Sequence, residues 1–161
     1  IDLRDNSGGL VTAAEQLAAR FTNKKVLVGY IRHKTGKGHR DFSPLQAQYL
    51  TPSNGIRWQK PVVVITNRGV YSAANEFVKY MKNLPNVTII GDKTGGGAGM
   101  PFSNELPNGW SVRFSAIPSY DSEQKTTEFG IEPHYNVSLK MEDLQRKKDT
   151  LIEFARKIIA K

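Results

Sequence analysis

Two glycines and a serine, each next to the expected start of a helix, are the first residues whose types and spacing could do chemistry. Gly8 and Gly9 follow an expected strand and precede an expected helix. Backbone N–H groups placed in this way can hold an oxyanion or a phosphate at the helix N-terminus. Adjacent glycines also make ordinary tight connections, so this pattern is weak by itself.

Ser72 lies at the junction of an apolar, strand-like run and a helix, and Ala73 and Ala74 follow it. A serine at this position can simply cap the helix N-terminus. It can also be a nucleophile on a sharp strand-to-helix turn, because small neighbours let a substrate carbonyl approach and the Ala73 N–H can donate to the oxyanion. Position alone leaves both interpretations open.

Residues 91–99 form a glycine-rich segment after an expected strand. The segment lacks the Gly-Lys-Ser/Thr ending of a Walker phosphate loop, since Lys93 precedes the glycines and no helix clearly follows. It is more typical of a flexible flap, or of a loop that lets a peptide backbone come close to a sheet edge. A nucleotide site is therefore disfavoured.

Composition narrows the class of protein. The chain has 161 residues, of which 39% are hydrophobic, and this predicts one folded globular domain. No apolar run is long enough for a membrane span, and the lack of cysteine excludes disulfides, thiolate nucleophiles and iron–sulfur clusters. The net charge of +8 raises nucleic-acid binding as an option, but no basic stripe alternates with stacking aromatics. We expect no cofactor, no metal and no nucleic-acid partner.

Strands that alternate with helices must position these loops. Apolar runs predict strands at residues 1–4, 25–31, 61–66 and 87–90. Helical periodicity predicts helices at residues 10–21, from about 72 to 81, and as one closing helix across 144–159. Residues 34–54 are expected to form a polar, mobile excursion, and residues 102–116 a hairpin with an Asn-Gly turn. This order predicts an α/β domain with a largely parallel sheet.

Five blocks of sequence, in this order and spacing, are far more specific than any one of them. They are IDLRDNSGG at residues 1–9, PVVVITN at 61–67, YSAANE at 71–76, GDKT at 91–94 and EFGIEP at 128–133. Together they resemble the S41 serine peptidases, which include the C-terminal processing peptidases and the tricorn core. The resemblance implies a crotonase/ClpP-like α/β core with a mostly parallel sheet, flanking helices and an appended hairpin. It also implies that residues 1–161 are a catalytic core truncated at its N-terminus.

The resemblance assigns roles to Ser72 and to the residues beside it. The serine that matches Ser72 is the nucleophile of the family. The oxyanion hole combines the N–H of Ala73 with an N–H of Gly8 or Gly9.

The residue at the expected position of the general base differs from that of one branch of the family. The Ser-Lys peptidases carry a basic lysine in the glycine-rich loop, but the matching position here is Gly97, and Lys93 matches an earlier, variable position. A glycine cannot take a proton from the serine. Glu128 matches the glutamate that orients the histidine in the tricorn-like branch, so we expect a Ser-His-Glu arrangement.

The histidine of that branch comes from a segment before the Asp-Leu-Arg strand, and His33, His39 and His134 match no base of the family. We therefore expect the base to lie upstream and residues 1–161 alone to be inactive or nearly so. The resemblance further implies a serine endopeptidase that acts on polypeptides and is exported to the periplasm or surface of a bacterium.

Two other classes of function stay open. Relatives of these peptidases use the same core to hold apolar ligands, so the domain is alternatively a non-catalytic binding module for peptides or apolar ligands. A nucleic-acid binder is suggested only by charge, and it predicts an affinity that falls steeply with salt.

Overall fold

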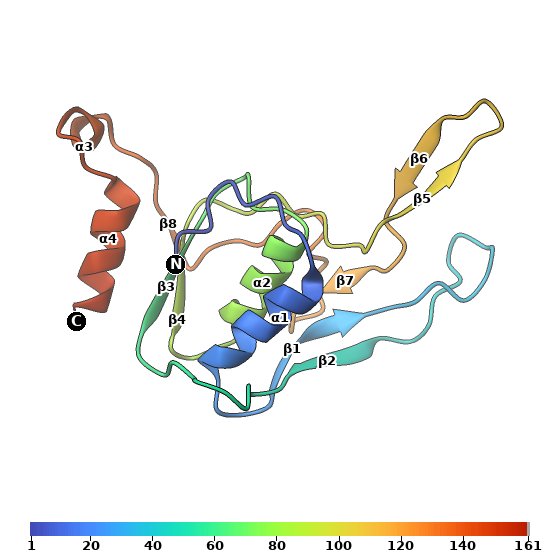
Figure 1. Ribbon diagram of the computed structural model, residues 1–161, viewed down its shortest axis with the longest axis horizontal. Coiled ribbons are helices and arrows are strands. Elements are labelled where there is room, and N and C mark those ends of the chain that lie inside the picture. Colours follow the sequence, from blue (N-terminus) through green and yellow to red (C-terminus); the bar gives the residue numbers. More distant parts are fainter. Residues whose placement is uncertain (161) are drawn as a thin grey trace.

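The computed structural model describes residues 1–160, which form stacked layers of helices and sheets in a mixed α/β arrangement (Figure 1). None of the helices in this part of the chain is long and apolar enough to cross a membrane. Lys161, the last residue of the expected domain, lies outside the described residues. In chain order the elements are α1 (Val11–Ala18), the 3₁₀ turn η1 (Ala19–Phe21), β1 (Val26–Ile31), β2 (Gln46–Leu50), β3 (Val62–Thr66), α2 (Ala73–Lys82), β4 (Val87–Gly91), β5 (Phe102–Glu105), β6 (Ser111–Phe114), β7 (Ser119–Tyr120), β8 (Tyr135–Asn136), α3 (Met141–Gln145) and α4 (Thr150–Ile159).

A parallel sheet with the strand order β3-β4-β8 forms the centre of the molecule. Every residue of β3 is buried, as expected for a continuous apolar run in a sheet covered on both faces. The N-terminal residues run parallel to β3, because the Leu3 N–H donates to the Ile65 carbonyl and the Ile65 N–H donates to the Ile1 carbonyl. The strands expected at 61–66 and 87–90 are confirmed.

A second sheet, in the order β2-β1-β7, is antiparallel throughout. The expected parallel sheet is confirmed in β3-β4-β8, and the antiparallel sheet is an addition that the sequence did not predict. The antiparallel sheet also contains β2, which lies inside the segment 34–54 that was expected to be a polar excursion. Its alternating Gln, Ala and Tyr side chains give little apolar signal, and the strand is held by its pairing with β1.

Helix α2 lies between the two sheets and is buried from Ala73 to Met81. Helix α1 packs on α2, and α4 covers the other face of the parallel sheet (Figure 1). The closing helix expected across 144–159 is instead two helices, α3 and α4. Lys147 interrupts them with a φ of 54°, and the Asp149 carboxylate caps α4 by accepting from the N–H groups of Leu151 and Ile152.

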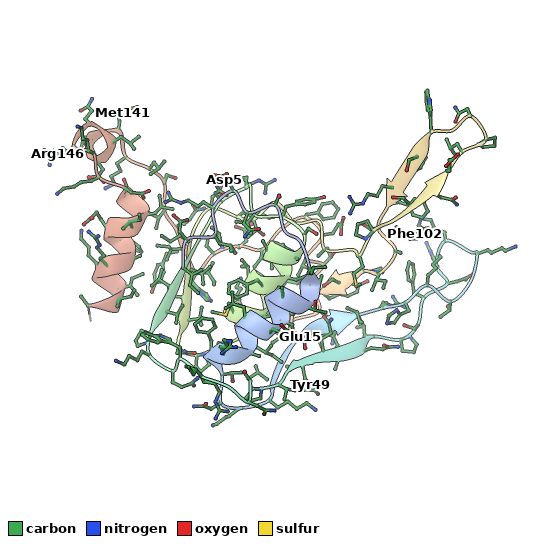
Figure 2. The ribbon with its side chains drawn as sticks, in the orientation of Figure 1. Asp5, Glu15, Tyr49, Phe102, Met141 and Arg146 are labelled. Atoms are coloured by element: carbon green, nitrogen blue, oxygen red, sulfur yellow. The ribbon has the colours of Figure 1, made fainter. Side chains whose placement is uncertain are left out.

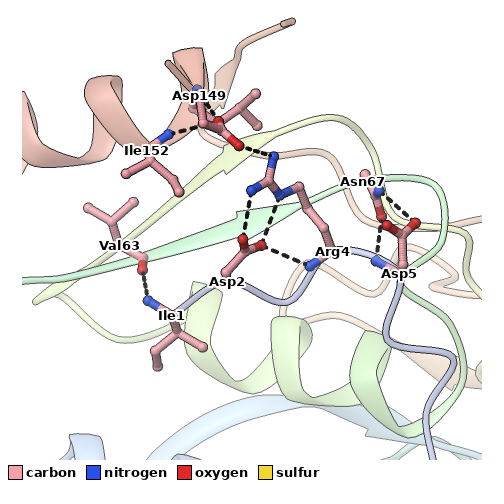
Figure 3. Close-up of polar contacts among 9 residues, drawn as sticks. Ile1, Asp2, Arg4, Asp5, Val63, Asn67, Asp149 and Ile152 are labelled. Atoms are coloured by element: carbon pink, nitrogen blue, oxygen red, sulfur yellow. Dashed lines mark hydrogen bonds and ion pairs between the residues drawn. The ribbon is translucent and has the colours of Figure 1, made fainter. Parts of the chain in front are cut away.

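An ion-paired arginine joins the N-terminal segment to α4 (Figure 3). The Arg4 guanidinium donates to Asp2 at 2.6 Å and lies 2.8 Å from the Asp149 carboxylate. The hydrogen bond from Arg4 holds the pKa of Asp2 below its ordinary value. On the next residue, Asp5 exchanges hydrogen bonds with Asn67 after β3, so the turn that leads to Gly8 is tied to the parallel sheet.

The β5 and β6 strands form a hairpin that projects from the body of the molecule (Figure 2). Every residue of both strands is exposed. Phe102 and Phe114 contact each other edge to face, with ring centroids 4.2 Å apart. The hairpin expected at 102–116 is confirmed, and Gly109 of the Asn-Gly pair has a positive φ of 82°.

Candidate active site

Ser72 occupies an unusual backbone conformation, with φ 56° and ψ −126°, immediately before α2. A non-glycine residue in this region costs of order 1–3 kcal/mol, and such residues gather at functional sites. The strain is held in place by two bonds, because the Ser72 N–H donates to the Gly96 carbonyl at 2.8 Å and its carbonyl accepts from the Glu76 N–H at 3.0 Å. The Ser72 hydroxyl caps no N–H of the helix, so the interpretation of this serine as a simple N-cap is wrong.

The glycine turn at residues 6–9 lies directly against Ser72. The Tyr71 N–H donates to the Asn6 carbonyl, and a Cβ added to Gly8 would come within 2.7 Å of the Ser72 Cβ. Gly8 also has a positive φ of 104°, which L-residues rarely adopt. A residue with a side chain would therefore push the turn away from the serine.

The N–H groups around Ser72 differ in their partners. Within residues 1–160, the N–H groups of Gly9 and Ala73 have no hydrogen-bond acceptor, whereas the Gly8 N–H donates to the Asn6 side chain at 3.0 Å. Gly9 and Ala73 line the same cavity as Ser72. Of the two glycines expected as donors, Gly9 is thus the one with a free N–H, and Gly8 sets the close approach of the turn.

Two cavities adjoin Ser72. The first, which we call the apolar cavity, has a volume of about 430 Å³, and its walls include Leu10, Val11, Ile31, Met100 and Ile117. The second, the outer cavity, has a volume of about 510 Å³ and is lined by residues that include Tyr71, Arg113 and Ser115. Ser72 lines both cavities and is therefore accessible to a ligand that occupies either of them.

Glu128 lies behind the glycine-rich loop. Its carbonyl accepts from the Gly97 N–H at 2.9 Å, and its carboxylate accepts from the Ser115 hydroxyl at 3.3 Å. Ser115 lines the outer cavity, whereas Glu128 lines neither cavity. The structure therefore brings Ser72, Ala73 and Gly9 to one place and sets Glu128 one residue away from it, through Ser115.

Gly97, which was expected to match the lysine of the Ser-Lys peptidases, occupies a position that is closed to a side chain. A Cβ added to Gly97 would overlap the ring of Tyr71, the residue before the serine. Lys93 is turned to another partner, since its ammonium pairs with Glu132 at 3.1 Å. Neither residue offers a base to Ser72.

The three histidines lie outside both cavities. The Nδ1 atom of His134 accepts from the Ile89 N–H at 2.9 Å, at the edge of the parallel sheet. Partial burial, together with the nearby Lys82, lowers the pKa of His134. His33 and His39 belong to the segment between β1 and β2.

A buried polar cluster beside the site was not expected from the sequence. Glu76 and Lys79, one turn apart on α2, pair at 2.6 Å, and Glu76 lines the apolar cavity. Gln48 of β2 and Ser119 of β7 bind the Lys79 ammonium. The available sequence signal was an i, i+3 pair of opposite charges in a helix whose other residues are largely apolar.

Residues 1–137 match the sequence profile of peptidase family S41. The chain belongs to this family. It is 26% identical over 115 residues to the carboxy-terminal processing protease CtpA of Bacillus subtilis, a match that covers 71% of this chain and 23% of that protein. It is 30% identical over 109 residues to the chloroplastic carboxyl-terminal-processing peptidase 2 of Arabidopsis thaliana, with 68% of this chain and 20% of that protein covered.

Two solved structures have the same fold as this chain. A protein of Parabacteroides merdae that is described as a peptidase is 50% identical, with a TM-score of 0.93 over 98% of this chain and 50% of that chain. Mature CPAF in complex with lactacystin is 16% identical, with a TM-score of 0.83 over 98% of this chain and 42% of that chain, and it shows the fold alone. The chain spans 20–23% of the length of the two processing peptidases.

Proposed function

We propose that this S41 member hydrolyses peptide bonds in polypeptides with Ser72 as the nucleophile. The strained backbone of Ser72, beside two cavities and two free N–H groups, is the observation that carries the proposal. The Ser72 Oγ attacks the peptide carbonyl carbon, a base takes the hydroxyl proton, and the Ala73 and Gly9 N–H groups hold the oxyanion. The amine leaves with that proton, and water then hydrolyses the ester to release the acid.

The base, in this proposal, is a histidine from a part of the protein outside residues 1–161. Three observations support it: the histidines of the described chain lie away from Ser72, Gly97 is closed to a side chain, and the Glu128 carboxylate sits behind Ser115. Glu128 orients that histidine in a Ser-His-Glu arrangement. Residues 1–161 by themselves are then inactive or nearly so.

Membership of the S41 family also bears on the whole protein and on its location. We propose that residues 1–161 form part of a crotonase/ClpP-like catalytic core and that the protein acts after export to the periplasm or the cell surface.

The test of this function compares the full-length protein with its Ser72→Ala variant. We expect turnover of a denatured protein substrate to fall at least about 10⁴-fold, since loss of a catalytic serine removes the covalent route. The unfolding free energy should change by less than about 1 kcal/mol, because the hydroxyl caps nothing. Turnover that survives in Ser72→Ala would overturn the assignment.

A binding module is the second candidate, and the 430 Å³ apolar cavity is the observation that favours it. It predicts that a fluorophosphonate probe leaves Ser72 unlabelled in the full-length protein, while an apolar ligand binds in the cavity. Labelling of Ser72 in the native protein, absent after unfolding, would exclude this alternative.

A further inference from the structure

Part of the wall of the apolar cavity is polar, although most of the wall is apolar. Glu76, Gln48 and Ser119 belong to this polar part, and they come from α2, β2 and β7. Glu76 is the one acidic side chain among the residues that line this cavity, and Arg113 of the exposed hairpin is the one basic side chain. A carboxylate at the base of a pocket beside a reactive serine ordinarily selects a basic side chain.

The Lys79 ammonium pairs with the Glu76 carboxylate and neutralises its charge, although Lys79 itself does not line the cavity. Its side chain is fully buried, and its ammonium lies 2.6 Å from Glu76 Oε2. The ammonium also donates to Gln48 Oε1 at 2.8 Å and to Ser119 Oγ at 2.7 Å, so all three of its protons are used. Burial lowers the pKa of Lys79, and the charge of Glu76 opposes that change.

The remaining oxygen of Glu76 is also occupied. The Ser119 hydroxyl, which accepts from Lys79, donates to Glu76 Oε1 at 3.0 Å. Glu76, Lys79 and Ser119 thus form a hydrogen-bonded set with no net charge. Beside Glu76, a cation would also approach Lys79 and an anion would meet the carboxylate, so a charged group there would lose hydration without an unpaired ion of opposite charge. Arg113 also lines the cavity, but it belongs to the exposed hairpin, where solvent screens its charge.

We propose that the apolar cavity receives an uncharged, apolar side chain on the acyl side of the scissile bond, and that the Lys79 ammonium masks Glu76 to set this preference. The inference rests on the proposed peptidase function and adds the class of substrate side chain. Lys79 is a specificity-determining residue that acts through Glu76, not a group that touches the reacting atoms. The cavity has room for one side chain of the size of Leu, Met or Phe.

Because Lys79 neutralises Glu76 in this proposal, two single variants should shift the preference for substrate side chains in opposite directions. Lys79→Met exposes the charge of Glu76, so the preference shifts from apolar toward basic side chains. Glu76→Gln leaves the Lys79 ammonium without its counter-ion, so the preference shifts toward acidic side chains. The double variant Glu76→Gln/Lys79→Met removes both charges and keeps the apolar preference. A merely structural role for the pair would not give shifts of opposite sign.

The experiment uses the full-length protein and peptidyl diphenyl phosphonates that carry Leu, Lys or Glu next to phosphorus. The serine oxygen displaces phenoxide from these probes, and the rate constant of Ser72 labelling reports the preference of the cavity. We expect the native protein to favour Leu. Lys79→Met should raise the Lys-to-Leu rate ratio at least about tenfold, and Glu76→Gln should raise the Glu-to-Leu ratio by a similar factor.

Lys82→Met is the matched control, since Lys82 lies one turn further along α2, donates to the Glu132 carbonyl and lines neither cavity. It should leave all three rates unchanged. Each variant is compared by its melting curve, and the double variant covers the case in which a single buried charge prevents folding: a charged preference there would overturn the inference. Labelling of Ser72 with unshifted ratios in folded Lys79→Met and Glu76→Gln would also overturn it. No labelling of the native protein by any probe would overturn the peptidase function itself.

Discussion

Two regions of the molecule that meet near Ser72, the packed core and the β5-β6 hairpin, differ in burial. Every residue of β3 is buried and α2 is buried over its first nine residues, whereas every residue of β5 and β6 is exposed. Ala73 is buried at the start of α2, and Ser72 just before it is half-buried. Met100 and Arg113, at the base of the exposed hairpin, contribute walls of the cavities. In the proposed mechanism the reacting atoms are therefore fixed by a packed core, while the cavity walls on the hairpin lie on segments with few packing constraints.

Two phenylalanines should give the largest difference in stability between the packed core and the hairpin. Phe77 of α2 is 3% exposed and Phe102 of the hairpin is 47% exposed. Phe77→Ala should lower the unfolding free energy by about 3–5 kcal/mol, because it leaves a cavity in the core. Phe102→Ala loses mainly its edge-to-face contact with Phe114, worth about 0.5–1.5 kcal/mol. Denaturant titrations of the full-length variants measure both values, and equal losses would break the contrast.

Two glycines extend the comparison between the region around Ser72 and the exposed hairpin, and the expected effect on stability is smaller. Gly8 and Gly109 both have a positive φ, but only Gly8 has atoms where a Cβ would stand. Gly8→Ala should lower kcat/KM about 10²-fold, because it displaces the turn from Ser72. Gly109→Ala should cost about 1 kcal/mol of stability through its backbone and leave kcat/KM unchanged. Peptide hydrolysis and thermal melts distinguish the two, and an active Gly8→Ala enzyme would contradict the close approach.

His134 tests how the edge of the parallel sheet responds to pH, with the smallest effect of the three. Its pKa is lower in the folded protein than in the unfolded chain, so the unfolded chain binds more protons as pH falls through the unfolded value of about 6.5. The stability from neutral His134 is full above that pH and is lost below it, with the Ile89 hydrogen bond. The intrinsic exchange rate of an amide falls from pH 7.5 to 5.5, and exchange of the Ile89 amide should slow down by less than this fall, because its protection decreases. In His134→Gln this decrease in protection should disappear, and its persistence would assign it to another group.

Local patterns were enough to predict the elements that depend on their own residues. The continuous apolar run of β3, the strand β1 and the Asn-Gly hairpin are where they were expected. β2 was missed because its residues become a strand only through pairing with β1. The break between α3 and α4 was missed because it depends on the conformation of Lys147 and on the cap from Asp149, neither of which interrupts the apolar spacing.

Some features of the candidate site also followed from the sequence, and others did not. The position of Ser72 before α2, and of the glycines beside it, followed from the order of the sequence blocks. The free N–H of Gly9 and the engaged N–H of Gly8 did not follow, because they depend on the side chain of Asn6. The Glu76–Lys79 pair could not be linked to a cavity from sequence, since Gln48 and Ser119 reach it from 31 and 40 residues away along the chain.

The backbone of Ser72 places opposing evolutionary pressures on one residue. A conformation that costs of order 1–3 kcal/mol is a sizeable share of the 5–15 kcal/mol by which domains are usually stable. Selection for stability alone would favour glycine at this position, and in the proposed mechanism only selection for chemistry opposes it. If the catalytic requirement were lost, the fold would gain stability by giving up its serine first, well before the core beneath it changed.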